Sequence, residues 1–268
     1  MTISELVASR ELLWNLTLRE LRTKYRRSVL GWAWSMLNPI ATAAIYSFVF
    51  GVLFEAVAPV GAPSGVENFA VFLLCALLPW NFFALVQVEG MGSVLGNAGL
   101  IRKVYFVRES LVFAKVLHGL VQFSIEMVLL CILLLFLGSN VVIWLPVTIL
   151  LMLMLAAFAA GIALALSVLT VYFRDLTYLW AIVLQVWFFA TPIVYPPNLL
   201  EGRVPSWARI LLDNNPMARF AAAFRRTLYD ATAPGWTTMA ALALLSVVSL
   251  VLGWTIFSRG SRRLAEEL

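Results

Sequence analysis

Long stretches without a charged residue constrain the fold of this chain more than any other feature. No Asp, Glu, Lys or Arg occurs in 28–54, 68–88, 127–173, 176–200 or 231–258. A helix needs about 20 apolar residues to cross the core of a bilayer, and each stretch offers that length. Apolar types make up 62% of the 268 residues and charged types 12%, so a water-soluble fold would expose too much apolar surface. We therefore expect an integral membrane protein.

Six membrane-spanning helices are predicted from these stretches. The stretch 127–173 is too long for one span, and Gly138-Ser139-Asn140 followed by Pro146 predicts a tight turn between two helices. The expected spans are about 32–54, 68–90, 110–137, 145–172, 177–195 and 236–258. The predicted fold class is an all-α polytopic membrane protein, with a transmembrane domain at 28–258 between an N-terminal segment, 1–27, and a tail, 259–268.

The distribution of basic residues predicts the orientation of these spans. The N-terminal segment carries six Lys and Arg residues, and the segment between the second and third spans carries Arg102, Lys103 and Arg108. The loops at 55–67 and 138–144 carry none. Because Lys and Arg favour the cytoplasmic side, both termini are expected there. The stretch 196–235 then lies outside, and its mixture of arginines and apolar residues predicts either short amphipathic helices at the outer membrane face or an ordinary folded loop.

The N-terminal segment has the pattern of an interfacial amphipathic helix. Apolar and aromatic residues recur at helical spacing on one face and arginines on another, namely Trp14, Leu18, Leu21 and Tyr25 against Arg19, Arg22 and Arg26. Such a helix lies on the membrane surface, where its basic face reaches anionic lipid headgroups or an acidic partner. Setting the topology is a second role for the same arginines.

The segment 97–109 places aromatic and apolar side chains among charges. A solvated loop has no need of Tyr105 and Phe106, whereas a short helix that inserts into a groove of another protein uses aromatic anchors of this kind. The alternative is an aromatic belt at the level of the lipid headgroups.

One face of the third span carries polar residues. Lys115, His118, Gln122 and Glu126 follow one another at intervals of three or four and therefore share a helix face. Charged groups at bilayer depth face a bundle interior or a wet cavity. This face is predicted to line a translocation path, to form a structural polar network, or, at Lys115, to reach the membrane surface.

Aromatic and small residues mark two further helix faces. The fifth span is rich in rings that form either a membrane-interface belt or a stacking surface for sugars, among them Trp180, Trp187, Phe188 and Tyr195. Small residues recur every four positions on two helix faces and predict close helix packing there, namely Ala157, Gly161 and Ala165 on one and Gly92 and Gly96 on the other.

The sequence lacks the residue patterns typical of nucleotide binding, metal binding and disulfide formation. The sequence contains no phosphate-binding loop of the G-x-x-x-x-G-K-[ST] type, and His118 is its one histidine. Cys75 and Cys131 both lie in apolar runs, so we expect neither a disulfide nor a metal site. The net charge of +5 is explained by membrane topology, so we expect no nucleic-acid partner.

The order of several short motifs resembles the permease subunits of ABC-2 type transporters, in the branch that exports O-antigen, teichoic acid or cell-wall galactan. The similar stretches lie at 18–34, 37–39, 79–83, 97–106, 173–176, 191–195, 215–220 and 224–225. Val107 stands where this branch often has proline, within the sequence Val-Tyr-Phe-Val-Arg-Glu.

This resemblance implies a non-enzymatic transport subunit in the bacterial plasma membrane. It implies a homodimer that docks two copies of a separate ATPase, and ATP and Mg bind to that ATPase. The implied substrate is a lipid-linked polysaccharide. The family's coupling helix maps onto 97–109, with contacts expected at Arg102, Lys103, Tyr105, Phe106, Arg108 and Glu109. Short re-entrant helices are implied before the last span. The expected channel lining is His118, Gln122, Glu126, Trp180, Trp187, Phe188 and Tyr195.

Two alternatives remain open at this point. A drug or lipid exporter of the same architecture would favour a more uniformly apolar cavity. A polytopic membrane enzyme acting on lipid-linked sugars would need clustered acids or a metal site at one membrane surface.

Overall fold

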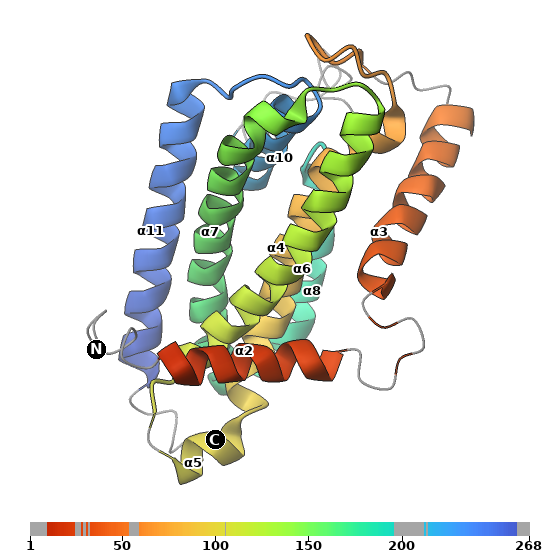
Figure 1. The fold of residues 1–268 in the computed structure, drawn as a ribbon. Coiled ribbons are helices and arrows are strands. Elements are labelled where there is room, and N and C mark those ends of the chain that lie inside the picture. Colours follow the sequence, from red (N-terminus) through yellow and green to blue (C-terminus); the bar gives the residue numbers. More distant parts are fainter. Residues whose placement is uncertain are drawn as a thin grey trace.

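Helices account for all the regular structure in the computed structural model, which describes residues 10–24, 28, 31, 33–53, 59–104, 106–195, 212 and 214–261. In chain order the elements are α2 (Arg10–Lys24), α3 (Ala33–Tyr46), the π-helix η1 (Ser47–Leu53), α4 (Phe69–Leu95), α5 (Ala98–Lys103), α6 (Glu109–Phe136), the 3₁₀-helix η2 (Val141–Trp144), α7 (Leu145–Tyr172), α8 (Leu176–Ala190), α10 (Pro216–Leu228) and α11 (Trp236–Gly260). Figure 1 shows their arrangement.

Within the described part of the chain, four helical segments are long and apolar enough to cross a membrane. They are Phe69–Lys103, Glu109–Phe136, Val141–Tyr172 and Trp236–Gly260. Two shorter apolar helices, Leu37–Val52 and Leu176–Ala190, coincide with parts of the first and fifth predicted spans. The prediction of an all-helical fold is confirmed for the described residues, and four of the six predicted spans have a helix of membrane-spanning length there.

The fifth helix is shorter than predicted because a proline ends it. α8 ends at Ala190, and Thr191 has extended backbone angles, with φ −100° and ψ 129°. The residue before a proline disfavours the helical conformation, and Pro192 has no N–H to continue the helix. At about 1.5 Å per residue, α8 is about 22 Å long, against about 30 Å for a bilayer core.

The turn predicted after the third span is a Schellman motif. Gly138 has a φ of 84°, which glycine adopts without strain. The N–H of Ser139 donates to the carbonyl of Leu134 at 3.0 Å, and the N–H of Gly138 donates to that of Leu135 at 3.0 Å. These bonds satisfy carbonyls at the end of α6, and the chain then turns back into η2 and α7.

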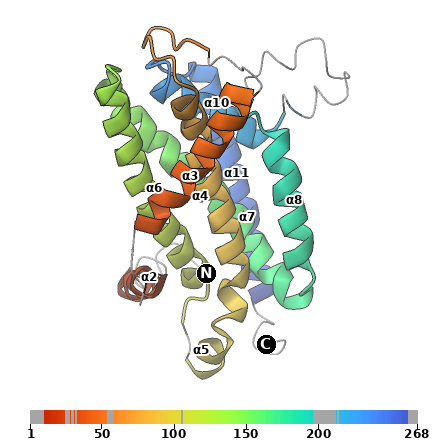
Figure 2. The same ribbon diagram turned by 90° about the vertical axis from the view of Figure 1, so that its right-hand side faces the viewer.

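The bundle has a central helix and two edges. α4 packs against α6, α7 and α10, and most of its apolar residues are buried. α7 runs closely along α11, whereas α3 and α8 make few contacts with the rest of the bundle. α3 stands at one edge of the bundle in Figure 1, and α8 at one edge in Figure 2.

Glycine allows α7 and α11 to approach closely. A Cβ on Gly253 would overlap the backbone of Gly161, and a Cβ on Gly161 would overlap the backbone of α11. The small-residue face around Gly161 is therefore a packing surface. The other predicted pair differs, because Gly92 faces open space and Gly90 packs instead, where a Cβ would lie 2.7 Å from that of Ala163.

α2 and α10 lie at opposite ends of the bundle. α2 crosses the bundle at the end where α5 projects and where α11 finishes (Figures 1 and 2). α10, in the second half of the stretch 196–235, packs at the other end against α4, α7 and α11. Residues 196–211 and 213, with 1–9 and 262–268, lie outside the described residues.

Candidate functional site

Charged side chains bind α2 to α4 and α6. We call Glu20, Lys24, Glu89, Lys115 and His118 the ion cluster. Lys115 Nζ donates to Glu20 Oε2 at 2.6 Å and lies 3.9 Å from Glu89 Oε2. Lys24 Nζ lies 3.9 Å from Glu89 Oε1, and His118 Nδ1 lies 3.0 Å from Glu89 Oε2. Three helices therefore meet around Glu89, and the cations and carboxylates compensate one another's cost of burial.

Two groups of the ion cluster lie on α2 and have shifted pKa values. Burial alone would raise the pKa of Glu20, but hydrogen bonds from Lys115 and Arg19 outweigh it and hold the pKa below its usual 4.5. Burial lowers the pKa of Lys24 below its usual 10.5, although Glu89 opposes this shift. Glu20 is therefore ionised at neutral pH, as its ion pair with Lys115 requires.

The polar face predicted on the third span continues from the ion cluster into the bundle. His118 is buried against Glu89, and Lys115 contacts α2. Lys24 Nζ donates to Gln122 Oε1 at 2.5 Å, and Gln122 Nε2 donates to Glu126 Oε1 at 2.8 Å. The first half of the face thus forms a structural network, while its role in lining a translocation path stays a prediction.

A polar groove of about 420 Å³ opens beside the second half of this face. It lies between the end of α2 and the helices α3, α4 and α6. Its polar and aromatic lining consists of Lys24, Trp34, Asn38, Asn81, Gln122 and Glu126, and its apolar lining of Pro39, Ala84, Leu85 and Val88. Polar groups are costly within a membrane span, so their gathering in one groove marks a candidate functional site.

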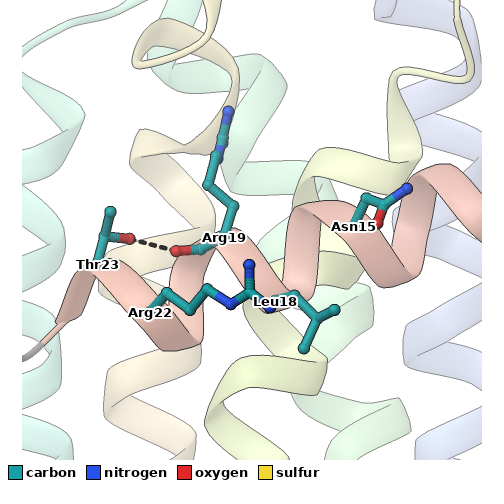
Figure 3. A pocket seen from close by; sticks show the side chains of 5 residues that line it. All are labelled: Asn15, Leu18, Arg19, Arg22 and Thr23. Carbon is teal, nitrogen blue, oxygen red and sulfur yellow. Dashed lines mark hydrogen bonds between the residues drawn. The ribbon is translucent and has the colours of Figure 1, made fainter.

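A hollow on α2 exposes the arginines of the predicted interfacial helix. It measures about 520 Å³ and is lined by Asn15, Leu18, Arg19, Arg22 and Thr23 (Figure 3). Trp14 is exposed, and Arg19 Nη2 donates to Asn97 Oδ1 at 2.9 Å, which connects α2 to the start of α5. Tyr25 and Arg26 lie outside the described residues.

The predicted coupling segment presents a basic and apolar surface at the same end of the bundle. Arg102, Lys103 and Val104 are exposed at the end of α5. A partner protein at this end of the molecule can therefore contact these three side chains.

Phe106, Arg108 and Glu109, which follow in the coupling segment, face the bundle. Phe106 packs partly against the core, and Arg108 Nη1 donates to the carbonyl of Ser261 beyond α11. Glu109 is only 4% exposed. Tyr105 lies outside the described residues.

The aromatic residues predicted on the fifth span pack mainly between α8 and α4. The rings of Trp187 and Phe188 lie 6.3 and 5.6 Å from that of Trp80, both edge to face. Trp180 is half-buried, and the hydroxyl of Tyr195 donates to a backbone carbonyl of α8 at 2.8 Å. These contacts hold the two helices together.

A buried arginine on α10 was not among the predicted site residues. Arg225 is 6% exposed, and its guanidinium lies 3.8 Å above the ring of Phe72. It donates to three backbone carbonyls, those of Phe72 at 3.2 Å, Ile193 at 2.5 Å and Pro192. The sequence signal for it was weak, namely an excess of arginines in a stretch expected outside.

Asn215 attaches the start of α10 to the end of α8. Its Oδ1 accepts from Trp187 Nε1 at 2.7 Å and caps α10 by accepting from the N–H of Met217 at 3.0 Å. Its Nδ2 donates to the carbonyl of Ala190 and to Thr191 Oγ1, both at 3.0 Å. The dipeptide Asn-Pro at 215–216 does predict a helix start, but not this contact.

Metal-ligating side chains are not grouped in the described ranges. No three His, Cys, Asp or Glu residues there are placed to hold one ion, and Cys75 and Cys131 are buried free thiols.

Comparisons with known proteins cover most of the chain. The family described as ABC-2 type transporter matches residues 11–229. The O-antigen export system permease protein RfbA of Myxococcus xanthus is 30% identical over 99% of this chain and 98% of its own length. A protein of the same name from Klebsiella pneumoniae is 27% identical over 96% and 95%. The polysialic acid transport protein KpsM of Escherichia coli is 23% identical over 90% of each chain.

Proposed function

Because this chain belongs to the ABC-2 type transporter family, we propose that it is the permease subunit of an ATP-driven exporter of lipid-linked polysaccharide in the bacterial plasma membrane. The observation that carries this proposal is similarity along nearly the whole chain to O-antigen export permeases. The second group of relatives, named for polysialic acid transport, also handles a polysaccharide.

The proposed assembly contains two copies of this chain and two ATPase subunits. Each permease contributes six spans, with the shorter α3–η1 and α8 as the first and fifth. Their sparse contacts within one chain leave room for contacts with a second copy. Both termini lie on the cytoplasmic side, where α2 and α5 share one end of the bundle.

ATP and Mg are bound by the partner, and this chain transmits the motion. The ATPase docks on the segment 97–109, where Arg102 and Lys103 are exposed. A displacement of this segment reaches α2 through the hydrogen bond between Arg19 and Asn97. It reaches the end of α11 through the hydrogen bond that Arg108 donates to the carbonyl of Ser261. The ion cluster then carries the motion of α2 to α4 and α6.

The proposal is tested in inside-out membrane vesicles that contain this chain and its partner ATPase. A radiolabelled lipid-linked glycan is added, and a glycosidase is supplied outside. Export moves the glycan into the lumen, so ATP should protect the label from cleavage, and a non-hydrolysable ATP analogue should not. Protection that requires neither ATP nor the permease would contradict the proposal.

A further inference from the structure

We propose that the polar groove between α2, α3, α4 and α6 binds uncharged, hydroxyl-rich sugar units of the exported chain. This inference rests on the proposed export function, and it adds a place of contact and a charge preference for the substrate. Its volume of about 420 Å³ falls within the range of about 300–1,000 Å³ typical of ligand sites.

Two amide side chains give the groove its hydrogen-bonding capacity for a ligand. Asn38 on α3 and Asn81 near the middle of α4 line it, while the amide of Gln122 on α6 is already bonded to Lys24 and Glu126. An amide offers both a donor and an acceptor, and this combination pairs with the neighbouring hydroxyls of a sugar. A lipid chain would leave these groups unpaired at a high cost, so a polar occupant fits the groove better.

An indole ring supplies the apolar contact that a sugar also needs. Trp34 borders the groove from α3, and 47% of its surface is exposed. The C–H face of a pyranose packs on such a ring while its hydroxyls reach the amides. Pro39 and Val88 extend this apolar surface.

The charges around the groove favour a neutral ligand. Among the lining residues that the structure describes, the one cation is Lys24 and the one acid is Glu126. The ammonium of Lys24 already donates to Gln122 at 2.5 Å and lies 3.9 Å from Glu89. An acidic sugar would therefore lose water without gaining a dedicated cation, which disfavours its binding.

Saturation-transfer difference NMR on the full-length permease with its ATPase in nanodiscs tests this site. The probes are maltohexaose, which is neutral, and hexagalacturonate, which has the same length and carries carboxylates. We expect transfer to maltohexaose and binding of hexagalacturonate at least about tenfold weaker, because its carboxylates lose water without gaining a cation. Absence of transfer to maltohexaose, or equal binding of both probes, would overturn the inference.

Variants then locate the binding. Asn38→Leu combined with Asn81→Leu should weaken maltohexaose binding about tenfold and leave the ion cluster in place. The control Thr255→Leu changes a half-buried polar residue on α11, outside the lining of the groove, whose hydroxyl bonds its own helix at 2.7 Å, so binding should not change. Full binding by the double variant would overturn the site.

A gain of binding guards against an effect of misfolding. Val88 lines the groove and is 60% exposed, so Val88→Lys adds a cation there. This variant should bind hexagalacturonate about tenfold more tightly than the wild type. The absence of any gain would contradict the charge argument.

The glycosidase-protection assay separates failure of this site from failure of the proposed function. If the wild type exports glycan but the double variant binds maltohexaose normally, only the proposed site is wrong. If the wild type exports no glycan, the proposed function is wrong.

Discussion

Replacing Gly253 with alanine should destabilise the packing of α7 against α11. The added Cβ would overlap the backbone carbonyl of Gly161 on the facing helix. Backbone atoms cannot rotate out of the way as a flexible side chain can, so the two helices have to move apart. The pair is among the most extensive in the bundle, and its contacts weaken along their length when the helices separate.

A matched control isolates the steric cost. Overpacking of a close contact costs about 1–3 kcal/mol. Alanine also recovers up to about 1 kcal/mol of helix propensity relative to glycine. Gly92→Ala receives that gain without a collision, because nothing lies within 4 Å of the added Cβ. The two variants should therefore differ in unfolding free energy by about 1–3 kcal/mol, with Gly253→Ala the less stable.

Unfolding in mixed micelles of rising SDS fraction, followed by far-UV circular dichroism, measures this difference. Both variants and the wild type are compared at the same lipid and detergent composition. Equal stability of Gly253→Ala and Gly92→Ala would refute the argument, because it would show that the helices adjust to the added methyl group without loss.

Three further predictions concern the ends of the bundle. Arg102→Glu with Lys103→Glu should reduce copurification of the ATPase at least about tenfold in an affinity pull-down, because two exposed charges are reversed. The folded-state pKa of Glu20 lies below 4.5, so its bond to Lys115 stabilises α2 above that pH and is lost as the pH falls through the lowered pKa. The hydrogen-exchange protection factors of the α2 amides, which are corrected for the intrinsic rate, should therefore be several-fold lower at pH 3.5 than at pH 6. Arg225→Met should lower the unfolding free energy by about 2–4 kcal/mol in the same SDS titration, because buried carbonyls lose their donor.

Each of these three has a contradicting result. Normal copurification would mean that the ATPase docks elsewhere. Equal protection factors in α2 at both pH values would mean that the bond between Glu20 and Lys115 does not hold α2 against the bundle. A stable Arg225→Met variant would show that water replaces the guanidinium. As a control, Arg225→Lys should retain part of the hydrogen bonding to the backbone carbonyls and therefore part of the stability.

The long apolar helices were predictable from the sequence because their signal is local. The predicted 145–172 coincides with α7, and 110–137 differs from α6 by one residue at each end. Apolar length alone extended the fifth span to residue 195, because the composition stays apolar past the point where Pro192 stops the helix.

The site was predictable only where it follows from the spacing on one helix. The face that carries His118 and Gln122 is set by helical periodicity, whereas its partners Glu20 and Glu89 come from other helices and depend on packing. Arg225 was harder still, because its partners are backbone carbonyls, which carry no signature in the sequence.

The ion cluster also constrains the order in which the chain matures. Glu20 leaves the ribosome 95 residues before Lys115, the side chain that will neutralise it. Until then Glu20 lacks this partner, and Glu89, which follows its partner Lys24 in the chain, still lacks Lys115 and His118. The packing of α2 against the bundle is therefore completed late, after α4 and α6 lie in the correct register.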